Sequence, residues 1–328
     1  MIKDQFNRVH DYVRISLTER CNLRCSYCMP AEGIQLRPRS EFMTAEEVVK
    51  MAKIFVSLGV KKIRLTGGEP LVRKDAEEII TGLSRLPIEL AISTNGILVD
   101  KYLETFKSCR LKSINVSLDS LKKEKFNAIT RRDHFDKVIS NINLLMENNF
   151  HVKINAVMIK GVNDDEVCDF VEWMRDKNIH VRFIEFMPFD GNKWDWSKGI
   201  SFKEIMTRIE SRYEGNVVKL EDAKNDTAKN YSIKNYKGTF AVISSVTNPF
   251  CDTCNRMRLT ADGKIKNCLF SGTETDLLSA MRNGEDIVPM ILESIWNKKA
   301  VRGGMETFED FSDSSKNQKN RSMVAIGG

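Results

Sequence analysis

Six of the eight cysteines fall into two sets of three. The first set is Cys21, Cys25 and Cys28, with the spacing C-x3-C-x2-C. Thiolates are the usual protein ligands of iron–sulfur clusters. Three closely spaced thiolates can hold three irons of a cubane cluster and leave the fourth iron open to a small molecule. The set therefore predicts a 4Fe-4S cluster. A structural zinc site is the alternative, but it takes four ligands, and the nearest further candidates are His10 and Cys109.

The second set also has three cysteines. Cys251 and Cys254 form a C-x2-C pair, and Cys268 follows after thirteen residues. All four histidines lie before position 181, so no local Cys3His zinc site is available. A redox-active dithiol would explain the pair but would leave Cys268 without a role. We therefore expect a second 4Fe-4S cluster.

Two arginines follow this pair at alternate positions, Arg256 and Arg258. If the segment is extended, both side chains face the same way. Paired guanidiniums beside an open metal site suit a phosphorylated or polar-edged substrate. A solvated pair of surface charges is the alternative.

The composition is that of an ordinary globular protein. The 328 residues are enough for one large α/β domain and a smaller second one. A net charge of +6 fits an anionic ligand better than nucleic acid, which usually demands a concentrated basic stripe. A merely solubilising surface charge is equally compatible with this number.

Targeting signals are not evident in the sequence. Residues 1–20 contain no secretory apolar core, and no apolar run is long enough to span a bilayer. We therefore expect a cytosolic protein without membrane contact, in which thiols stay reduced. Cys109 and Cys168 stand alone and are most simply buried apolar residues.

Short apolar runs alternate with helical patterns from Asp11 to Met187. The clearest helix covers residues 44–58, where Thr44 and Glu47 form a capping box and Gly59 ends the pattern. The strand-like runs are residues 13–17, 62–66, 90–93, 113–118, 152–157 and 181–186. Six such units imply parallel strands with helical crossovers.

The unusual residues of this part follow the strands. They are the first cysteine loop, Gly67-Gly68-Glu69-Pro70, Thr94-Asn95-Gly96 and Ser117-Leu118-Asp119. In βα barrels the loops at that end build the active site. An open doubly wound sheet is the rival, but no glycine-rich dinucleotide fingerprint follows the first strand. We predict an α/β fold with an incomplete (β/α)6 TIM-type barrel, open on one side.

The pattern changes after Met187, and we predict two domains. Residues 1–218 would form the barrel, and residues 219–328 a smaller domain with the second cluster. Residues 219–230 are polar and typical of a linker, and β-like runs follow at 231–233 and 239–243. The polar stretch 311–322 is expected to be mobile.

The Gly67-Gly68-Glu69-Pro70 segment gives the first cysteine set a context. Its glycines allow a backbone to approach a ligand closely, and Glu69 could pair with an ammonium group. With C-x3-C-x2-C one βα unit earlier, the segment resembles the radical S-adenosylmethionine (SAM) superfamily. The resemblance implies that the open iron chelates the methionine part of SAM and that Tyr27 lies beside the adenine.

Nearly the whole chain is similar to the GTP 3',8-cyclase family of molybdenum cofactor biosynthesis. The resemblance covers residues 14–28, 63–70, 113–119, 182–187, 251–258 and 326–328. It implies that the first cluster passes one electron to SAM, which gives methionine and a 5'-deoxyadenosyl radical. That radical would take the hydrogen from C3' of GTP, and the C3' radical would add to guanine C8. Reduction would then give 3',8-cyclo-7,8-dihydro-GTP, with the second cluster holding the guanine edge.

The same resemblance implies the site residues. Those for SAM are Tyr27, Gly68, Ser117 and Met187, and those for GTP are Arg14, Arg64, Ser93, Lys153, Arg256 and Arg258. Those implied in catalysis are Arg14, Arg256, Arg258, Gly327 and Gly328. Five of the six GTP residues are cationic, which suits a triphosphate. Ser93 departs from the family pattern, which has threonine there.

The resemblance also implies partners: a flavodoxin or ferredoxin as electron donor and cyclic pyranopterin monophosphate synthase downstream, with a homodimer possible. Three alternatives remain open: a radical SAM peptide-modifying enzyme with an auxiliary cluster, a zinc-stabilised binding module, and a carrier protein ending in Gly327-Gly328. Peptide-modifying enzymes usually have more C-terminal cysteines, and such carriers are much smaller than this chain.

Overall fold

The computed structural model describes residues 1–30, 32–35, 37–111, 113–189, 192, 194–307, 309–310 and 320–327. Gly328 and most of the predicted mobile stretch, residues 311–319, therefore lie outside the described residues. None of the helices in the described part of the chain is both long and apolar enough to cross a lipid bilayer.

The first helix forms as its sequence predicts. α1 spans Ala45–Ser57, and Thr44 and Glu47 make both hydrogen bonds of the capping box. Its buried stripe includes Val48, Met51 and Phe55, because residues three and four apart share one face of a helix. Gly59, at φ +101°, follows the end of the helix in a conformation that other residues rarely adopt.

Six parallel strands form the centre of the sheet, in chain order. They are β1 (Tyr12–Ser16), β2 (Lys62–Thr66), β3 (Glu89–Thr94), β4 (Ser113–Ser117), β5 (His151–Met158) and β6 (Ile179–Glu185). The sequential order has no point of reversal, unlike a doubly wound sheet. The prediction of an incomplete barrel is confirmed, with strand ends displaced by at most two residues.

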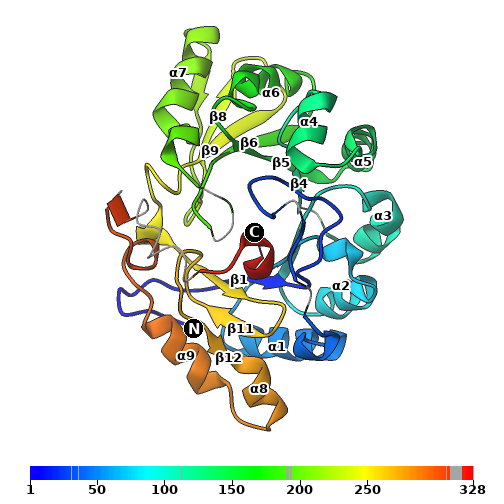
Figure 1. Ribbon diagram of the computed structural model, residues 1–328, viewed down its shortest axis with the longest axis vertical. Coiled ribbons are helices and arrows are strands. Elements are labelled where there is room, and N and C mark those ends of the chain that lie inside the picture. Colours follow the sequence, from blue (N-terminus) through cyan, green and yellow to red (C-terminus); the bar gives the residue numbers. More distant parts are fainter. Residues whose placement is uncertain are drawn as a thin grey trace.

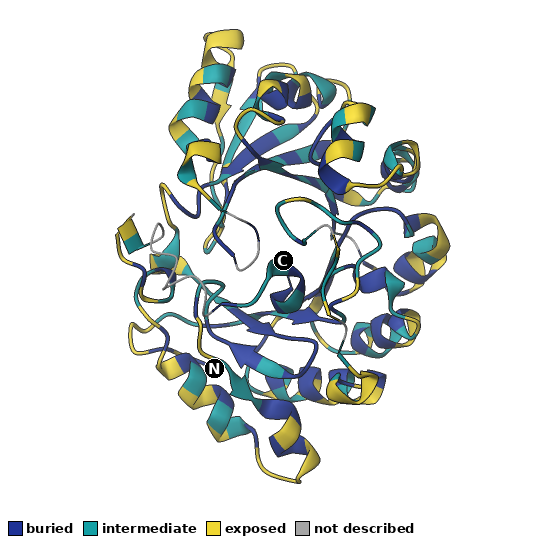
Figure 2. Cartoon of the chain, in the orientation of Figure 1, coloured by how far each residue is buried: buried dark blue, intermediate teal, exposed yellow. Residues whose placement is uncertain are grey.

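The helices lie on the outside of this curved sheet (Figure 1). After α1 they are α2 (Ala76–Ser84), α3 (Val99–Ser108), α4 (Lys123–Thr130), α5 (Phe135–Glu147), α6 (Val167–Trp173) and α7 (Phe202–Arg212). Their exposed faces point outward, whereas the strands are mostly buried (Figure 2). Alternate residues of β5, from Val152 to Met158, are fully buried, as expected where one face packs against helices.

The remaining strands extend both edges of the same sheet. β9 (Thr239–Ile243) pairs with β6 in parallel, and β8 (Lys229–Ile233) and β7 (Val217–Lys219) continue from it. At the other edge β10 (Arg256–Leu259) pairs with β1 in parallel, followed by β11 (Lys264–Lys266) and β12 (Thr275–Asp276). The predicted boundary between residues 218 and 219 thus falls inside β7, and strands on both sides of it share one twelve-stranded sheet. A division into two folding units stays a prediction.

Three further helices complete the described chain. α8 (Leu277–Arg282) and α9 (Val288–Trp296) lie beside β11 and β12, and α12 (Met323–Ile326) follows near the C-terminus. α12 lies near the middle of the curved sheet, close to β1 (Figure 1). Val324 and Ile326 on this turn are buried, so the C-terminal segment is docked rather than frayed.

Candidate functional site

The first cysteine loop begins directly after β1. Its backbone is held on one side by β2, where the amides of Gly68 and Glu69 donate to the carbonyls of Thr18 (2.7 Å) and Arg20 (2.8 Å). On the other side the amide of Ser26 donates to the carbonyl of Ile129 (2.9 Å) at the end of α4. Two neighbouring elements therefore fix the loop before any ligand binds.

The three thiols of this loop lie close enough to influence one another. Burial, and then the neighbouring charges, raise the pKa of Cys21 to about 11 and of Cys28 to about 12. Burial raises the pKa of Cys25 as well, with contributions from Asp119 and both other cysteines. The amide of Leu23 donates to Cys21 Sγ (3.4 Å). Buried thiolates repel one another and need cations between them, which fits three irons of a cluster.

The glycines after β2 pack closely against the first cysteine loop. A Cβ at Gly68 would lie 2.4 Å from the carbonyl oxygen of Arg20, and one at Gly67 would lie 2.6 Å from that of Thr18. Both glycines are therefore required by the packing of this segment against the cysteine loop. The predicted close approach of a ligand to this backbone stays a prediction.

The buried carboxylate of Glu69 connects the segments that follow β2 and β3 by hydrogen bonds. Its carboxylate accepts hydrogen bonds from the amides of Leu71 (3.0 Å) and Asn95 (2.6 Å) and from the hydroxyl of Thr94 (2.8 Å). Burial raises the pKa of Glu69 to about 7, against these hydrogen bonds. Its predicted pairing with an ammonium group stays a prediction.

The residues predicted for SAM lie at one rim of the barrel. Tyr27 follows β1, Gly68 follows β2, Ser117 ends β4 and Met187 follows β6, and carboxyl ends of parallel strands share one edge. The hydroxyl of Tyr27 donates to Asp119 Oδ2 (2.8 Å). That bond ties the cysteine loop to the end of β4.

The second cysteine set lies at the edge where β10 begins. Its thiols receive hydrogen bonds from one further segment: the amide of Arg302 donates to Cys251 Sγ (3.4 Å) and Lys298 Nζ to Cys254 Sγ (3.3 Å). Although burial opposes it, the charges of Lys298 and Arg256 lower the pKa of Cys254 to about 6. A thiolate is thus favoured at Cys254, as metal ligation requires.

Both sets fit iron–sulfur clusters by donor chemistry: three thiols each, coupled to one another and with hydrogen bonds to sulfur. Within the described residues no three His, Cys, Asp or Glu side chains are arranged to hold a single metal ion. Of the two lone cysteines, Cys109 is buried as predicted, whereas Cys168 is only partly so.

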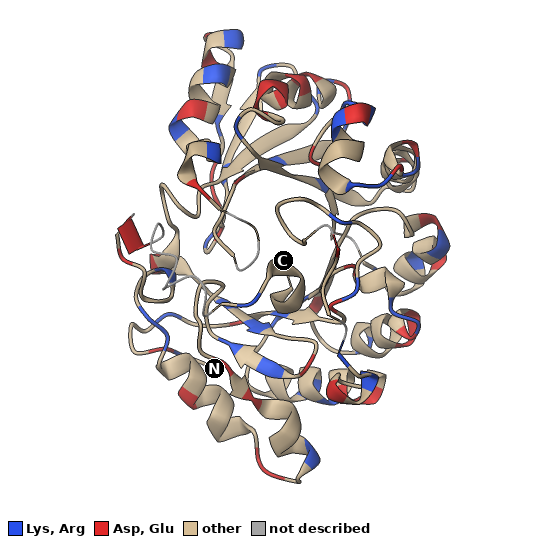
Figure 3. Cartoon of the chain, in the orientation of Figure 1, with Lys and Arg blue, Asp and Glu red and all other residues tan. Residues whose placement is uncertain are grey.

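Lys and Arg residues lie on strands near the C-terminus (Figure 3), and the strand register shows which face they share. Arg14 on β1 is in register with Arg258 on β10 and Arg64 on β2, and Arg256 is in register with Tyr12. Across the sheet Ser93 is in register with Asn115 and Asn115 with Lys153. Because residues in register on parallel neighbours face the same side, all six residues predicted for GTP lie on one face.

These cations repel one another in a buried environment. Burial, followed by the charges of Arg182 and Arg64, lowers the pKa of Lys153 to about 8. Burial and Arg14 lower the pKa of Arg258 to about 9. Such a row of like charges costs free energy in the empty protein, and an anion on this face would recover it.

Arg182 on β6 belongs to the same face and is missing from the predicted site residues. It is in register with Asn155, and burial and Arg64 lower its pKa to about 9. Its Nε and one terminal nitrogen are buried without a hydrogen-bond partner among the described residues. The sequence held one signal for this residue, because Arg182 is a charged residue between the apolar residues Val181 and Phe183 of β6.

Other inner polar atoms are also unsatisfied. Among the described residues, these buried atoms without a partner include the hydroxyls of Ser93 and Ser113, the carbonyl oxygens of Asn115 and Asn155, and one nitrogen of Arg256. Buried polar groups normally have partners, so a polar ligand is expected here. Both donors and acceptors are present, which suits a ligand with phosphate and hydroxyl groups.

The C-terminal segment reaches this cationic face. Arg258 donates a hydrogen bond to the carbonyl of Gly327. A Cβ at Gly327 would lie 2.5 Å from Thr66 Oγ1 and 3.1 Å from Ser16 Cβ, and its φ is +73°. Only glycine fits this position without displacement.

Sequence patterns did not predict three side-chain hydrogen bonds. They join Lys298 to Cys254, Tyr27 to Asp119 and Arg321 to Asp262. Each joins residues at least 44 positions apart, and neither spacing nor periodicity predicts such pairs.

Comparisons with known proteins agree with this arrangement. Residues 15–174 match the family model described as Radical SAM superfamily, and residues 179–303 match the one described as Molybdenum Cofactor Synthesis C. The GTP 3',8-cyclase, mitochondrial, of Arabidopsis thaliana is 47% identical over 334 residues, covering 100% of this chain and 84% of that protein. The GTP 3',8-cyclase of Listeria welshimeri is 40% identical, covering 100% and 99%.

Other relatives are longer. Molybdenum cofactor biosynthesis protein 1 of Drosophila melanogaster is 46% identical over 91% of this chain, which spans only 54% of that protein. Among solved structures, Streptococcus suis SuiB has a TM-score of 0.62 at 16% identity, covering 90% of this chain and 68% of SuiB. That likeness concerns the fold.

Proposed function

Because the chain belongs to the GTP 3',8-cyclase family of radical SAM enzymes, we propose that it converts GTP into (8S)-3',8-cyclo-7,8-dihydroguanosine 5'-triphosphate. This lyase-class reaction is the first step of molybdenum cofactor (molybdopterin) biosynthesis. The observation that supports it best is the row of buried cations on the inner face, with unsatisfied polar atoms beside it.

The roles of the residues follow from their places. Cys21, Cys25 and Cys28 hold the first cluster, and the rim residues Tyr27, Gly68, Ser117 and Met187 bind SAM. When bound, this cluster and SAM supply the radical that removes hydrogen from the ribose. The protein orients SAM by the Tyr27–Asp119 bond, which fixes the loop against β4.

GTP occupies the cationic face. The triphosphate meets Arg64, Lys153 and Arg182, because these long side chains project from neighbouring parts of the inner face. The hydroxyl of Ser93 and the amide of Asn115 satisfy ribose or base groups. The C-terminal segment lies against this face, because Arg258 bonds the carbonyl of Gly327.

The second cluster is held by Cys251, Cys254 and Cys268. Arg256 and Arg258 follow Cys254 on β10 and orient the base between this cluster and Arg14. Ring closure at guanine C8 leaves a base radical that needs one electron and one proton.

An external flavodoxin or ferredoxin supplies the electrons, and cyclic pyranopterin monophosphate synthase takes the product. A cytosolic location and a homodimer complete the proposal.

The direct test is anaerobic turnover of GTP with SAM and a reductant, with the product identified by mass spectrometry. Formation of 5'-deoxyadenosine without a cyclised nucleotide, in the presence of GTP, would contradict the proposed substrate. A peptide-modifying enzyme would leave GTP unchanged. Stoichiometric zinc instead of iron and acid-labile sulfide would indicate a binding module.

The Cys268→Ser variant separates the two clusters. We expect it to lose about half of the iron, because one ligand of the second cluster is missing, and to retain SAM cleavage by the first. Iron content and 5'-deoxyadenosine formation are measured on the same preparation, with Cys109→Ser as the control. Loss of SAM cleavage with all iron retained would refute this assignment of roles.

GTP affinity should fall as the pH rises above about 8. Lys153 has a pKa of about 8 in the empty site, and contact with phosphate raises it. The contribution of this lysine to binding is therefore fully present below pH 8 and declines above it.

Calorimetry between pH 7 and pH 8.5, below the pKa of about 9 of Arg182 and Arg258, measures the effect. Lys153→Arg is the matched variant, because a guanidinium keeps its charge to a higher pH than an ammonium group. The variant should show a flatter pH profile. Equal pH profiles of both proteins would show that Lys153 is not the titrating contact.

A further inference from the structure

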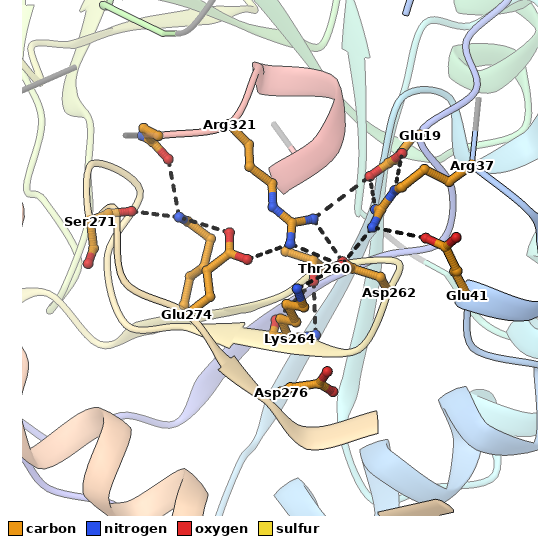
Figure 4. A network of polar contacts seen from close by, with 12 residues as sticks. Glu19, Arg37, Glu41, Thr260, Asp262, Lys264, Ser271, Glu274, Asp276 and Arg321 are labelled. Carbon is orange, nitrogen blue, oxygen red and sulfur yellow. Dashed lines mark hydrogen bonds and ion pairs between the residues drawn. The ribbon is translucent and has the colours of Figure 1, made fainter. Parts of the chain in front are cut away.

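A network of charged residues surrounds the start of the docked C-terminal segment (Figure 4). Glu19 precedes the first cysteine loop, Arg37 follows it, Asp262 lies in the turn between β10 and β11, Glu274 adjoins β12, and Arg321 precedes α12. None of these residues belongs to the SAM or GTP sites described above. We call this group the Arg321 network.

Asp262 is the centre of the network. Its carboxylate accepts hydrogen bonds from Arg321 Nη1 and Nη2, both at 2.9 Å, and from Arg37 Nη1 at 3.0 Å. Asp262 is only 5% exposed. Although burial opposes it, these arginines hold the pKa of Asp262 far below its usual range. The carboxylate therefore stays ionised, and its bonds are charge-assisted and strong.

Both arginines have a second acidic partner. Arg37 pairs with Glu19 by two hydrogen bonds, and Arg321 pairs with Glu274. Arg321 Nη1 also lies 3.9 Å from Glu19 Oε1. Because each guanidinium bridges two carboxylates, the segments before Cys21 and before α12 are held to the same turn.

A second contact lies one residue earlier in the chain. Asn320 Nδ2 donates to the carbonyl of Leu269 (2.9 Å), the residue after Cys268. Its Oδ1 accepts from Lys266 Nζ (3.1 Å), and this fully buried ammonium also donates to the carbonyl of Ser271 (2.6 Å). The entry point of the C-terminal segment is thus bonded to the segments around both cysteine sets.

The segment from Arg321 to Gly327 is short and largely helical, so its two ends cannot move far apart. One helical turn, Met323–Ile326, occupies most of it, and Val324 and Ile326 are buried. At its far end Arg258 bonds the carbonyl of Gly327. A helical residue advances only ~1.5 Å, so the position of Arg321 determines how far Gly327 reaches along the cationic face.

We propose that Arg321 and Asp262 are positioning residues that seat the C-terminal segment against the substrate site. The inference rests on the proposed function and deepens it, since it assigns residues that neither bind substrate nor ligate a cluster. Without this pair, Gly327 leaves its place between Thr66, Ser16 and Arg258, and the cyclisation slows.

The test compares Arg321→Met, which keeps the aliphatic stem, with Asp262→Asn, which keeps the shape of the side chain. Hydrogen exchange of residues 322–327, measured by mass spectrometry, reports the seating directly and needs no turnover. We expect faster exchange of this segment in both variants and at least 10-fold less cyclised nucleotide. Iron content and 5'-deoxyadenosine formation should stay within twofold of the wild type.

Arg208→Met is the matched control, because Arg208 on α7 makes a comparable ion pair with Asp164, and α7 lies far from the C-terminal segment (Figure 1). It should leave both measurements unchanged. The double variant Arg321→Met/Asp262→Asn should be less impaired than the sum of the two single effects, because both single variants lose the same contact.

Unchanged exchange in the single variants would overturn the proposal, and so would normal product yield from a segment that exchanges fast. Loss of iron in proportion to product would assign the network to cluster retention instead. These outcomes differ from failure of the proposed function, in which the wild-type protein itself yields no cyclised nucleotide.

Discussion

We expect the Arg182→Met variant to be more stable than the wild type and to bind GTP about 10- to 100-fold more weakly. The stability increases because Arg182 is a buried charge whose Nε and one terminal nitrogen have no partner among the described residues. Removing an unsatisfied buried group typically relieves about 1–3 kcal/mol. Binding weakens because a charge-assisted contact contributes about 1.5–3 kcal/mol.

Thermal unfolding of the empty protein and calorimetric GTP titration measure these two opposite effects. Arg73→Met is the control, since Arg73 is similarly buried but bonds the carbonyls of Leu17 and Met43 and the carboxylate of Asp75. Its replacement should lower the melting temperature. If Arg182→Met also lowers it and leaves GTP affinity intact, Arg182 is a structural residue.

The second large effect concerns Gly327. We expect Gly327→Val to reduce cyclised nucleotide at least 100-fold while 5'-deoxyadenosine is still formed. A side chain there meets Thr66 Oγ1 at 2.5 Å and a φ of +73°, a conformation that costs non-glycine residues about 1–2 kcal/mol. Deleting Gly327 and Gly328 should have the same result, because Gly327 provides the carbonyl that Arg258 bonds.

Both products are quantified in one reaction. Gly215→Val is the matched control, because Gly215 has a φ of +70° with no atom within 4 Å of a Cβ. It carries the same conformational cost without the clash and should keep full activity. The variant Gly327→Ala should recover in part when Thr66 is also changed to Ala, since this removes the nearest atom. Full product yield from Gly327→Val would show that the position of the segment is irrelevant.

Most of the correct sequence-based predictions rest on local patterns of residue type and spacing. The helix at Ala45–Ser57 and the six strands depend on interactions within a few residues, such as the capping box of Thr44 and Glu47. The two cysteine sets are also local, since Cys21, Cys25 and Cys28 lie within one loop. Sequence spacing therefore predicts these features well.

The glycines after β2 are an instructive exception. Their presence indicated a special backbone, and the structure adds that a side chain at either position would collide with the carbonyl of Thr18 or Arg20 in the loop after β1. A sequence pattern can show that only glycine is tolerated. It does not show whether a ligand or another part of the chain excludes the side chain.

The sequence by itself predicted two sets of cluster ligands and determined the six βα units and the family, because short-range spacing and periodicity encode them. Only the tertiary structure decided that strands β9 and β10 extend both edges of one sheet, that Arg182 joins the cationic face, and that Arg321 reaches Asp262. These features depend on strand register and on packing between residues far apart in the chain. Their free energy arises only when the whole sheet is formed and its buried charges face one another.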